Sequence, residues 1–250
     1  MFNTGLETEN IVRWLQDQVK QAGVSGLVVG LSGGIDSSVA AALIQRAVGH
    51  RALGLILPIS SNPEDGEHGK MAAKAAGLAH ITLDLSETQK GIMSHLTRAL
   101  ESIGCEVPGR MADANLRARL RMSTIYAAAN SLGALVVGTD NAAELYTGYF
   151  TKYGDGGCDI LPLAQYTKAE VGKLGAYLGV PEPILQKPPS AGLWPGQTDE
   201  AEMGLTYDII DRYLLGERIP EPSRQRIELL HRQSQHKREL PPIYQRHNLQ

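Results

Sequence analysis

The 250-residue sequence is poor in cysteine, has no long apolar run and carries no excess of basic charge. Its two cysteines, Cys105 and Cys158, form no C-x-x-C pair, which is typical of a protein kept reduced in the cytoplasm. No stretch reaches membrane length and no signal-peptide pattern opens the chain, so we expect no membrane association. Because 24 Lys and Arg face 27 Asp and Glu, we expect no nucleic-acid partner.

Several familiar site patterns are missing as well. A Walker A loop needs a lysine followed by serine or threonine after its last glycine, but Ile35 and Asp36 stand there. The dinucleotide pattern G-x-G-x-x-G is absent, because the neighbouring glycines have the wrong spacing. No serine or cysteine is accompanied by a recognisable catalytic histidine, so Cys158 is interpreted as a free thiol.

The stretch LVVGLSGGIDSSVAAALI, residues 27–44, is the first informative feature. Residues 27–31 are typical of a buried strand, and the alanine-rich residues 35–44 are typical of a helix. Ser32, Gly33 and Gly34 then form a strand-to-helix turn whose free N–H groups suit a phosphate. Asp36 would repel that phosphate unless Mg²⁺ lay between them, although an aspartate also simply stabilises a helix N-terminus. The pattern therefore favours a magnesium–pyrophosphate site without a lysine in the loop.

Strand-like runs at residues 27–31, 52–57, 80–83 and 134–137 alternate with helical segments. This order predicts an α/β fold with a doubly wound, mostly parallel sheet flanked by helices, preceded by an amphipathic helix that buries Ile11, Leu15 and Val19. Residues 60–69 are interpreted as a mobile polar loop. We expect a single domain over residues 1–250, in which residues 186–250 form a lid and a C-terminal helical segment.

The second informative region, GTDNAAELYTGYFTKYGDGGCDILPLAQYTK, covers residues 138–168. It follows a predicted buried strand, so its first residues should face the same crevice as the glycine-rich turn. Thr139 and Glu144 are then candidates for contacts to ATP and to a metal ion. The alternative is a helix N-cap at Thr139 or Asp140, with Glu144 in an exposed turn.

These motifs carry a resemblance. SGGIDSS resembles the pyrophosphate loop of the N-type ATP pyrophosphatases, which have an adenine nucleotide alpha hydrolase-like fold and cleave ATP to AMP and pyrophosphate. The segments GTDNAAE, TGYFTKYGDGGCDILPL and YTK resemble the signature of the NAD synthetases. NLRARLRMSTIYAAAN, KPPSAGLWPGQTDEAEMGLTYDIIDRYL and HKRELPP resemble other segments of that family, so the similarity covers about residues 6–242. Without it, the arginines of residues 115–130 would be interpreted as a solvated helix face.

The resemblance implies site residues one by one. The implied ATP-binding residues are Gly30, Leu31, Ser32, Gly33, Gly34, Ile35, Asp36, Ser37, Thr139, Lys168 and Ser190. Asp36 and Glu144 would bind Mg²⁺, and Asp36, Lys168 and Ser32 would be catalytic. The implied deamido-NAD-binding residues are Arg119, Lys152, Asp159, His236 and Lys237. Ser190 stands where the family often has threonine, so its hydroxyl is retained.

The resemblance also implies an activity. It is the ATP-dependent amidation of deamido-NAD by ammonia, through an NAD-adenylate, with release of AMP and pyrophosphate. The chain would then be a carbon–nitrogen ligase and a homodimer that binds the dinucleotide between its subunits. One helix precedes the first strand, so no glutaminase domain is expected. The alternatives are another amidating or thiolating ATP pyrophosphatase and a non-catalytic nucleotide-binding module.

Overall fold

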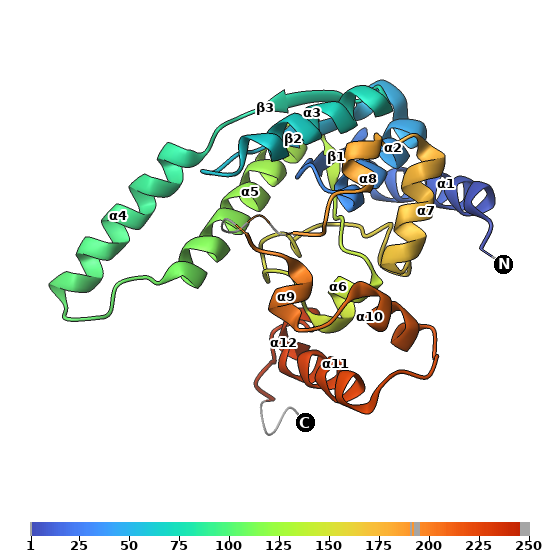
Figure 1. The fold of residues 1–250 in the computed structure, drawn as a ribbon. Helices are drawn as coiled ribbons and strands as arrows, with labels where there is room; N and C mark the ends of the chain where they lie inside the picture. The colour runs from blue at the N-terminus through green and yellow to red at the C-terminus, as the bar shows by residue number, and fades with distance from the viewer. Residues whose placement is uncertain (1, 191, 193–195, 246–250) are drawn as a thin grey trace, which may run out of the picture.

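A parallel sheet lies at the centre of the computed structural model, which describes residues 2–190, 192 and 196–245 (Figure 1). Its strand order within this part of the chain is β3-β2-β1-β4. The strands are β1 (Gly26–Gly30), β2 (Ala52–Ile56), β3 (Ala79–Thr82) and β4 (Ala134–Val137). The chain winds from β1 outward to β3 and then returns to pair β4 with β1. The predicted doubly wound parallel sheet is confirmed, with each strand within one residue of its expected position.

The two faces of the sheet follow the alternation of side chains along β1. Leu27 and Val29 pack into a core with helices α1 (Thr4–Ala22), α2 (Ile35–Val48), α3 (Pro63–Ala76) and α7 (Lys168–Leu178). Val28 faces the opposite side, where α5 (Arg110–Leu132) covers the sheet. The predicted amphipathic face of α1 is confirmed, because Ile11, Leu15 and Val19 are all buried. Both layers thus hold the carboxyl ends of β1 and β4 firmly in place.

The interpretation of residues 60–69 as a loop is wrong, because most of this stretch belongs to α3. The Asn62 side chain accepts a hydrogen bond from the N–H of Glu64 and caps the helix, and Pro63 occupies its first turn. Two acidic side chains, Glu64 and Asp65, suit the positive end of the helix dipole. Capping therefore outweighs the polarity of the segment.

Helix α4 (Ser86–Ser102) and the first half of α5 project from the sheet as a two-helix arm (Figure 1). Gln89 is the only buried residue of α4, whereas apolar side chains such as Ile92 and Leu96 are exposed. Strand β3 is exposed along its whole length. The arm and the edge strand together present an apolar surface that this chain leaves uncovered.

The C-terminal helices lie beyond the carboxyl ends of the strands (Figure 1). They are α9 (Asp199–Met203), α10 (Tyr207–Leu214), α11 (Glu221–Gln233) and α12 (Gln235–Arg238), whereas α8 (Glu182–Leu185) packs with α3 and α7 on one face of the sheet. Tyr207, Ile210 and Ile227 share a small core with Ala143 of helix α6 (Ala142–Thr147), which follows β4. A single-turn 3-10 helix, η1 (Gly49–Arg51), precedes β2. No helix in the described part of the chain has the length and apolar character needed to cross a membrane.

Candidate active site

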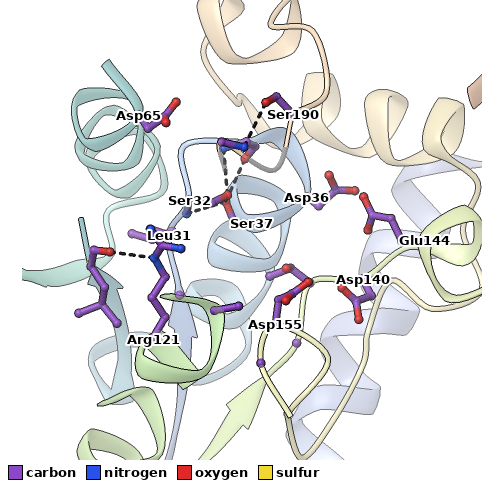
Figure 2. Close-up of a pocket in the computed structure, with 18 of the residues that line it drawn as sticks. Leu31, Ser32, Asp36, Ser37, Asp65, Arg121, Asp140, Glu144, Asp155 and Ser190 are labelled. Carbon is purple, nitrogen blue, oxygen red and sulfur yellow. Dashed lines mark hydrogen bonds between the residues drawn. The ribbon is translucent and has the colours of Figure 1, made fainter. Parts of the chain in front are cut away.

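The glycine-rich turn between β1 and α2 is braced by its own serines. Ser37 Oγ accepts a hydrogen bond from the N–H of Ser32 at 3.3 Å, and the two serine hydroxyls are 3.0 Å apart (Figure 2). Gly33 has a φ of +78°, and a Cβ there would overlap the carbonyl oxygen of Asp65 in α3. Glycine is therefore required at this position both by the backbone conformation and by the close approach of α3.

A cavity of about 300 Å³ opens above this turn, at the carboxyl ends of β1, β2 and β4. All the predicted ATP-binding residues line it except Gly33, whose backbone lies behind the turn against α3. Thr139, Glu144 and Lys168 come from segments far from the turn in the sequence and reach the same cavity. The structure thus brings the predicted nucleotide and metal residues together, at the point where the strand order reverses.

The side chains of Asp36 and Glu144 share one lysine. Lys168 Nζ lies 2.6 Å from Asp36 Oδ2 and 3.4 Å from Glu144 Oε1. Asn141 links the same carboxylates, since its Nδ2 donates to Asp36 Oδ1 at 2.9 Å and its N–H donates to Glu144 Oε2 at 3.0 Å. The N-cap of α6 is thus Asn141, and Glu144 closes a capping box with a side chain only 15% exposed. The alternative that placed the cap at Thr139 or Asp140 and exposed Glu144 is wrong.

Burial governs the protonation of this cluster. It raises the pKa of Glu144 to about 7, and the neighbouring Asp36 carboxylate adds to the rise. Burial opposes the charge of Lys168, but Asp36 and Glu144 outweigh it and raise the pKa of that ammonium above its ordinary value. Lys168 therefore stays positive between two acids that compete for it.

Asp36 and Glu144 fit a magnesium ion. Mg²⁺ prefers oxygen ligands and commonly takes one or two carboxylates together with substrate phosphates. The two carboxylates stand beside the glycine-rich turn, and the mutual repulsion that raises the pKa of Glu144 is what a further cation would relieve. Within the described residues no group of three His, Cys, Asp or Glu side chains could hold a metal ion. A magnesium ion held by Asp36 and Glu144 would need phosphate or water as its remaining ligands.

A second acidic pair was missed by the sequence reasoning. Asp140 and Asp155 point toward one another across the cavity wall (Figure 2). Asp140 is 5% exposed, and no residue in the described part of the chain donates a hydrogen bond to its Oδ2. Burial raises the pKa of both carboxyl groups, and for Asp140 the Asp155 carboxylate raises it further. Both lie inside quoted motifs, GTDNAAE and KYGDGG, but nothing in the sequence indicated that they meet.

Arg121 of α5 is another cavity residue that the sequence did not single out. Its Nε donates to the carbonyl oxygen of Leu57 at 2.9 Å and its Nη2 donates to Ser61 Oγ at 3.0 Å (Figure 2). Burial lowers the pKa of its guanidinium. The interpretation of these arginines as a solvated face therefore fails at Arg121, although Arg119, two residues earlier, is exposed.

The predicted deamido-NAD residues lie outside the cavity. Arg119 donates to the carbonyl oxygen of Lys152 at 3.3 Å, and Lys152 Nζ donates to the carbonyl oxygen of His236. Lys237 Nζ donates to two carbonyl oxygens of the segment that follows α6. Asp159 is apart from these four and accepts hydrogen bonds from Tyr126 and from the backbone of β4. The structure therefore brings four of the five together, on the far side of a loop whose inner residues face the cavity.

Neither cysteine belongs to a catalytic constellation. Both are free, as expected, and Cys105 is exposed on the arm. Burial raises the pKa of the Cys158 thiol to about 12, so it is protonated and a poor nucleophile near neutral pH.

Comparison with known proteins gives a consistent result. The sequence profile described as NAD synthase matches residues 7–241. The chain is 53% identical over 240 residues to the NH(3)-dependent NAD(+) synthetase of Alkaliphilus metalliredigens, covering 95% of this chain and 97% of that one. Among solved structures it is similar to an NMN synthetase from Francisella tularensis, with a TM-score of 0.91, 40% identity and coverage of 98% and 99% of the two chains. It is also similar to an NH3-dependent NAD synthetase from Campylobacter jejuni, with a TM-score of 0.79, 26% identity and coverage of 98% and 100%.

Proposed function

The chain belongs to the NAD synthase family, and we propose that it amidates deamido-NAD with ammonia at the expense of ATP, as a carbon–nitrogen ligase. One observation carries this proposal. The glycine-rich turn, Asp36, Glu144 and Lys168 converge on a single cavity at the carboxyl ends of β1 and β4. Such a cluster suits the departure of pyrophosphate from ATP, which is the activation step that this reaction needs.

The chemistry explains why ATP is required. A carboxylate is a poor electrophile because its leaving group would be oxide. An oxygen of the nicotinate carboxylate attacks the α-phosphorus of ATP, and the bond from that phosphorus to pyrophosphate breaks. Ammonia then attacks the carbonyl carbon of the resulting mixed anhydride, the bond to AMP breaks, and the new amide loses a proton. These two reaction steps need no protein nucleophile, which agrees with the raised pKa of the Cys158 thiol.

The cavity residues take separate parts in these steps. Ser32, the N–H groups of the turn and Lys168 stabilise the charge that develops on the departing pyrophosphate. Asp36 and Glu144 would hold a magnesium ion, which when bound would supply Lewis-acid stabilisation of phosphate charge. Asp140 and Asp155 line the cavity, and an ionised carboxylate of this pair is the proposed acceptor of the proton that ammonium must lose before ammonia attacks. Much of the remaining catalysis is the positioning of two substrates with water excluded.

We further propose a homodimer. The two-helix arm exposes Ile92, Leu96, Ile103, Val107 and Met111, and a second copy of the chain would cover such a surface. The predicted deamido-NAD residues lie outside the ATP cavity, as a site completed by a second subunit would require. Sedimentation should give twice the mass of one chain, and a monomer at micromolar concentration would contradict this.

Because both thiols are free, we place the enzyme in the cytoplasm.

A second candidate substrate is favoured by one observation. The similar Francisella tularensis protein is described as an NMN synthetase, and amidation of the mononucleotide is the same reaction at the same carboxylate. The cavity itself does not discriminate, because the residues expected to hold the dinucleotide lie outside it. The ratio of kcat/KM for deamido-NAD to that for nicotinate mononucleotide decides between the two substrates.

The direct test is incubation of the purified chain with ATP, Mg²⁺, ammonium and deamido-NAD. NAD, AMP and pyrophosphate should appear in equal amounts, and ammonia-free glutamine should not replace ammonium. Formation of ADP and phosphate, or no NAD from either pyridine substrate, would contradict the proposed function. Turnover with glutamine comparable to that with ammonium would contradict the assigned nitrogen source.

A further inference from the structure

Helix α10 lies outside the sheet, yet two of its side chains reach the catalytic cluster. Tyr207 and Asp211 are one turn apart, so they project from the same face of the helix. Each is only 5% exposed. Both lie in the segment KPPSAGLWPGQTDEAEMGLTYDIIDRYL, but the sequence analysis singled out neither, and the reaction described above does not use them.

Tyr207 contacts two members of the catalytic cluster, Glu144 and Lys168, and it also contacts Asp199. Its hydroxyl lies 3.2 Å from Glu144 Oε1 and 3.0 Å from Asp199 Oδ2, so the single O–H donor is shared between these two acceptors. Lys168 Nζ lies 4.7 Å from the centre of its ring, within the range of a cation–π contact. Tyr207 thus bounds the space in which Glu144 and Lys168 can move.

Asp211 acts on the main chain of the same lysine. Its two carboxylate oxygens accept hydrogen bonds from the N–H groups of Lys168, at 3.1 Å, and of Ala169, at 2.9 Å. Thr167 caps the next free N–H group of α7, that of Glu170. The start of α7 is therefore satisfied from outside its own helix, and Lys168 extends from a fixed backbone.

We propose that α10 is a positioning element of the catalytic site, in which Tyr207 orients Glu144 and the Lys168 ammonium while Asp211 fixes the backbone of Lys168. This inference rests on the proposed function. It also links α9 to the cluster, because Asp199 lies at the start of α9 and shares the hydroxyl of Tyr207 with Glu144. The position of Asp199 therefore affects the hydrogen bond that Glu144 receives from Tyr207.

Tyr207→Phe is the primary test, because it removes the hydroxyl and keeps the buried ring. Tyr213→Phe is the matched control, since Tyr213 lies on the same helix and its hydroxyl pairs only with that of Tyr146, at 3.1 Å, among the contacts the structure describes. The loss of a hydrogen bond to a charged group should lower the kcat of Tyr207→Phe about 10- to 100-fold, with less than about threefold change in the KM for ATP. Tyr213→Phe should stay within about twofold of the unaltered chain.

A second readout does not depend on turnover. Binding of Mn²⁺ to the chain with a non-hydrolysable ATP analogue, followed by electron paramagnetic resonance, should weaken several-fold in Tyr207→Phe and not in Tyr213→Phe. Asp211→Asn, which turns one acceptor into a donor, should also lower kcat, whereas Asp208→Asn at an exposed position of α10 should not. Equal kcat and equal Mn²⁺ affinity for Tyr207→Phe and Tyr213→Phe would overturn the inference. A chain that makes no NAD at all would instead overturn the proposed function.

Discussion

Asp36 and Glu144 share the ammonium of Lys168, so the loss of either charge alters all three groups. Replacement of either carboxylate by its amide, Asp36→Asn or Glu144→Gln, keeps the shape and removes a proposed magnesium ligand. We expect kcat to fall by at least about 100-fold and the Mg²⁺ concentration for half-maximal rate to rise. Steady-state kinetics over a Mg²⁺ titration checks this, with circular dichroism to show that the fold is intact. Near-normal turnover in either variant would contradict the metal assignment.

The effect of burial on the pKa of Asp140 can be tested through protein stability, without measuring catalysis. Its folded-state pKa is raised, first by burial and then by Asp155, so the folded protein binds its proton more tightly than the unfolded chain does. The contribution of Asp140 to folding stability is then largest below the ordinary pKa of aspartate, and it falls as the pH rises toward the folded-state pKa of this residue. Asp140→Asn is neutral at every pH. We therefore expect its Tm to exceed that of the unaltered chain by a few degrees at pH 8, and the gap to close toward pH 4. A gap that is constant with pH would contradict the raised pKa.

Individual site residues could be predicted from the sequence where they belong to one contiguous motif. The turn at residues 30–37 was found because glycines, serines and Asp36 follow one another directly, and Glu144 and Lys168 came from motifs of the family. Arg121, Tyr207 and Asp211 lie in segments that were quoted for the resemblance, but no role was predicted for them. Their contacts join residues from distant helices, and each residue by itself has an ordinary helical context.

At the scale of elements, the glycine-rich turn depends on α3, the helix that the sequence reasoning took for a loop. Gly33→Ala should destabilise the fold, because its Cβ would meet the Asp65 carbonyl and its φ is positive. Gly23, after α1, is the control: its φ is +65° but a Cβ there meets nothing within 4 Å. Gly23→Ala should cost about 1 kcal/mol for the backbone alone, and Gly33→Ala clearly more, with weaker ATP binding. Urea unfolding measures both, and equal losses would show that α3 does not press on the turn.

Strand positions and the first helices were predictable because buried alternation and helical periodicity are local signals. The failure at α3 has an equally local cause. The Asn62 cap and Pro63 are recognised helix-start signals, but the polar character of the stretch was given more weight. The lid prediction at residues 186–200 falls partly on residues 191 and 193–195, which lie outside the described residues.

At the scale of the whole molecule, the sheet and the C-terminal helices contribute different residues to the site. The carboxyl ends of β1 and β4 supply the turn, Asp36 and the segment that leads to Glu144, whereas α10 braces the cluster from the opposite side. In the two-helix arm, α4 takes no part in the cavity, whereas α5 contributes Ala118 and Arg121 to its lining. The arm also carries an uncovered apolar surface. Local sequence patterns predicted the sheet, but not how the distant C-terminal helices close onto it.

The central claim is that the chain activates a carboxylate by transferring AMP to it. The most direct measurement uses deamido-NAD labelled with ¹⁸O in its nicotinate carboxylate, together with ATP, Mg²⁺ and ammonium, and determines the label by mass spectrometry of the products. If the carboxylate oxygen attacks the α-phosphorus and AMP later leaves with that oxygen, each AMP formed gains one ¹⁸O and pyrophosphate gains none. Label in inorganic phosphate, or NAD formed with unlabelled AMP, would contradict the account.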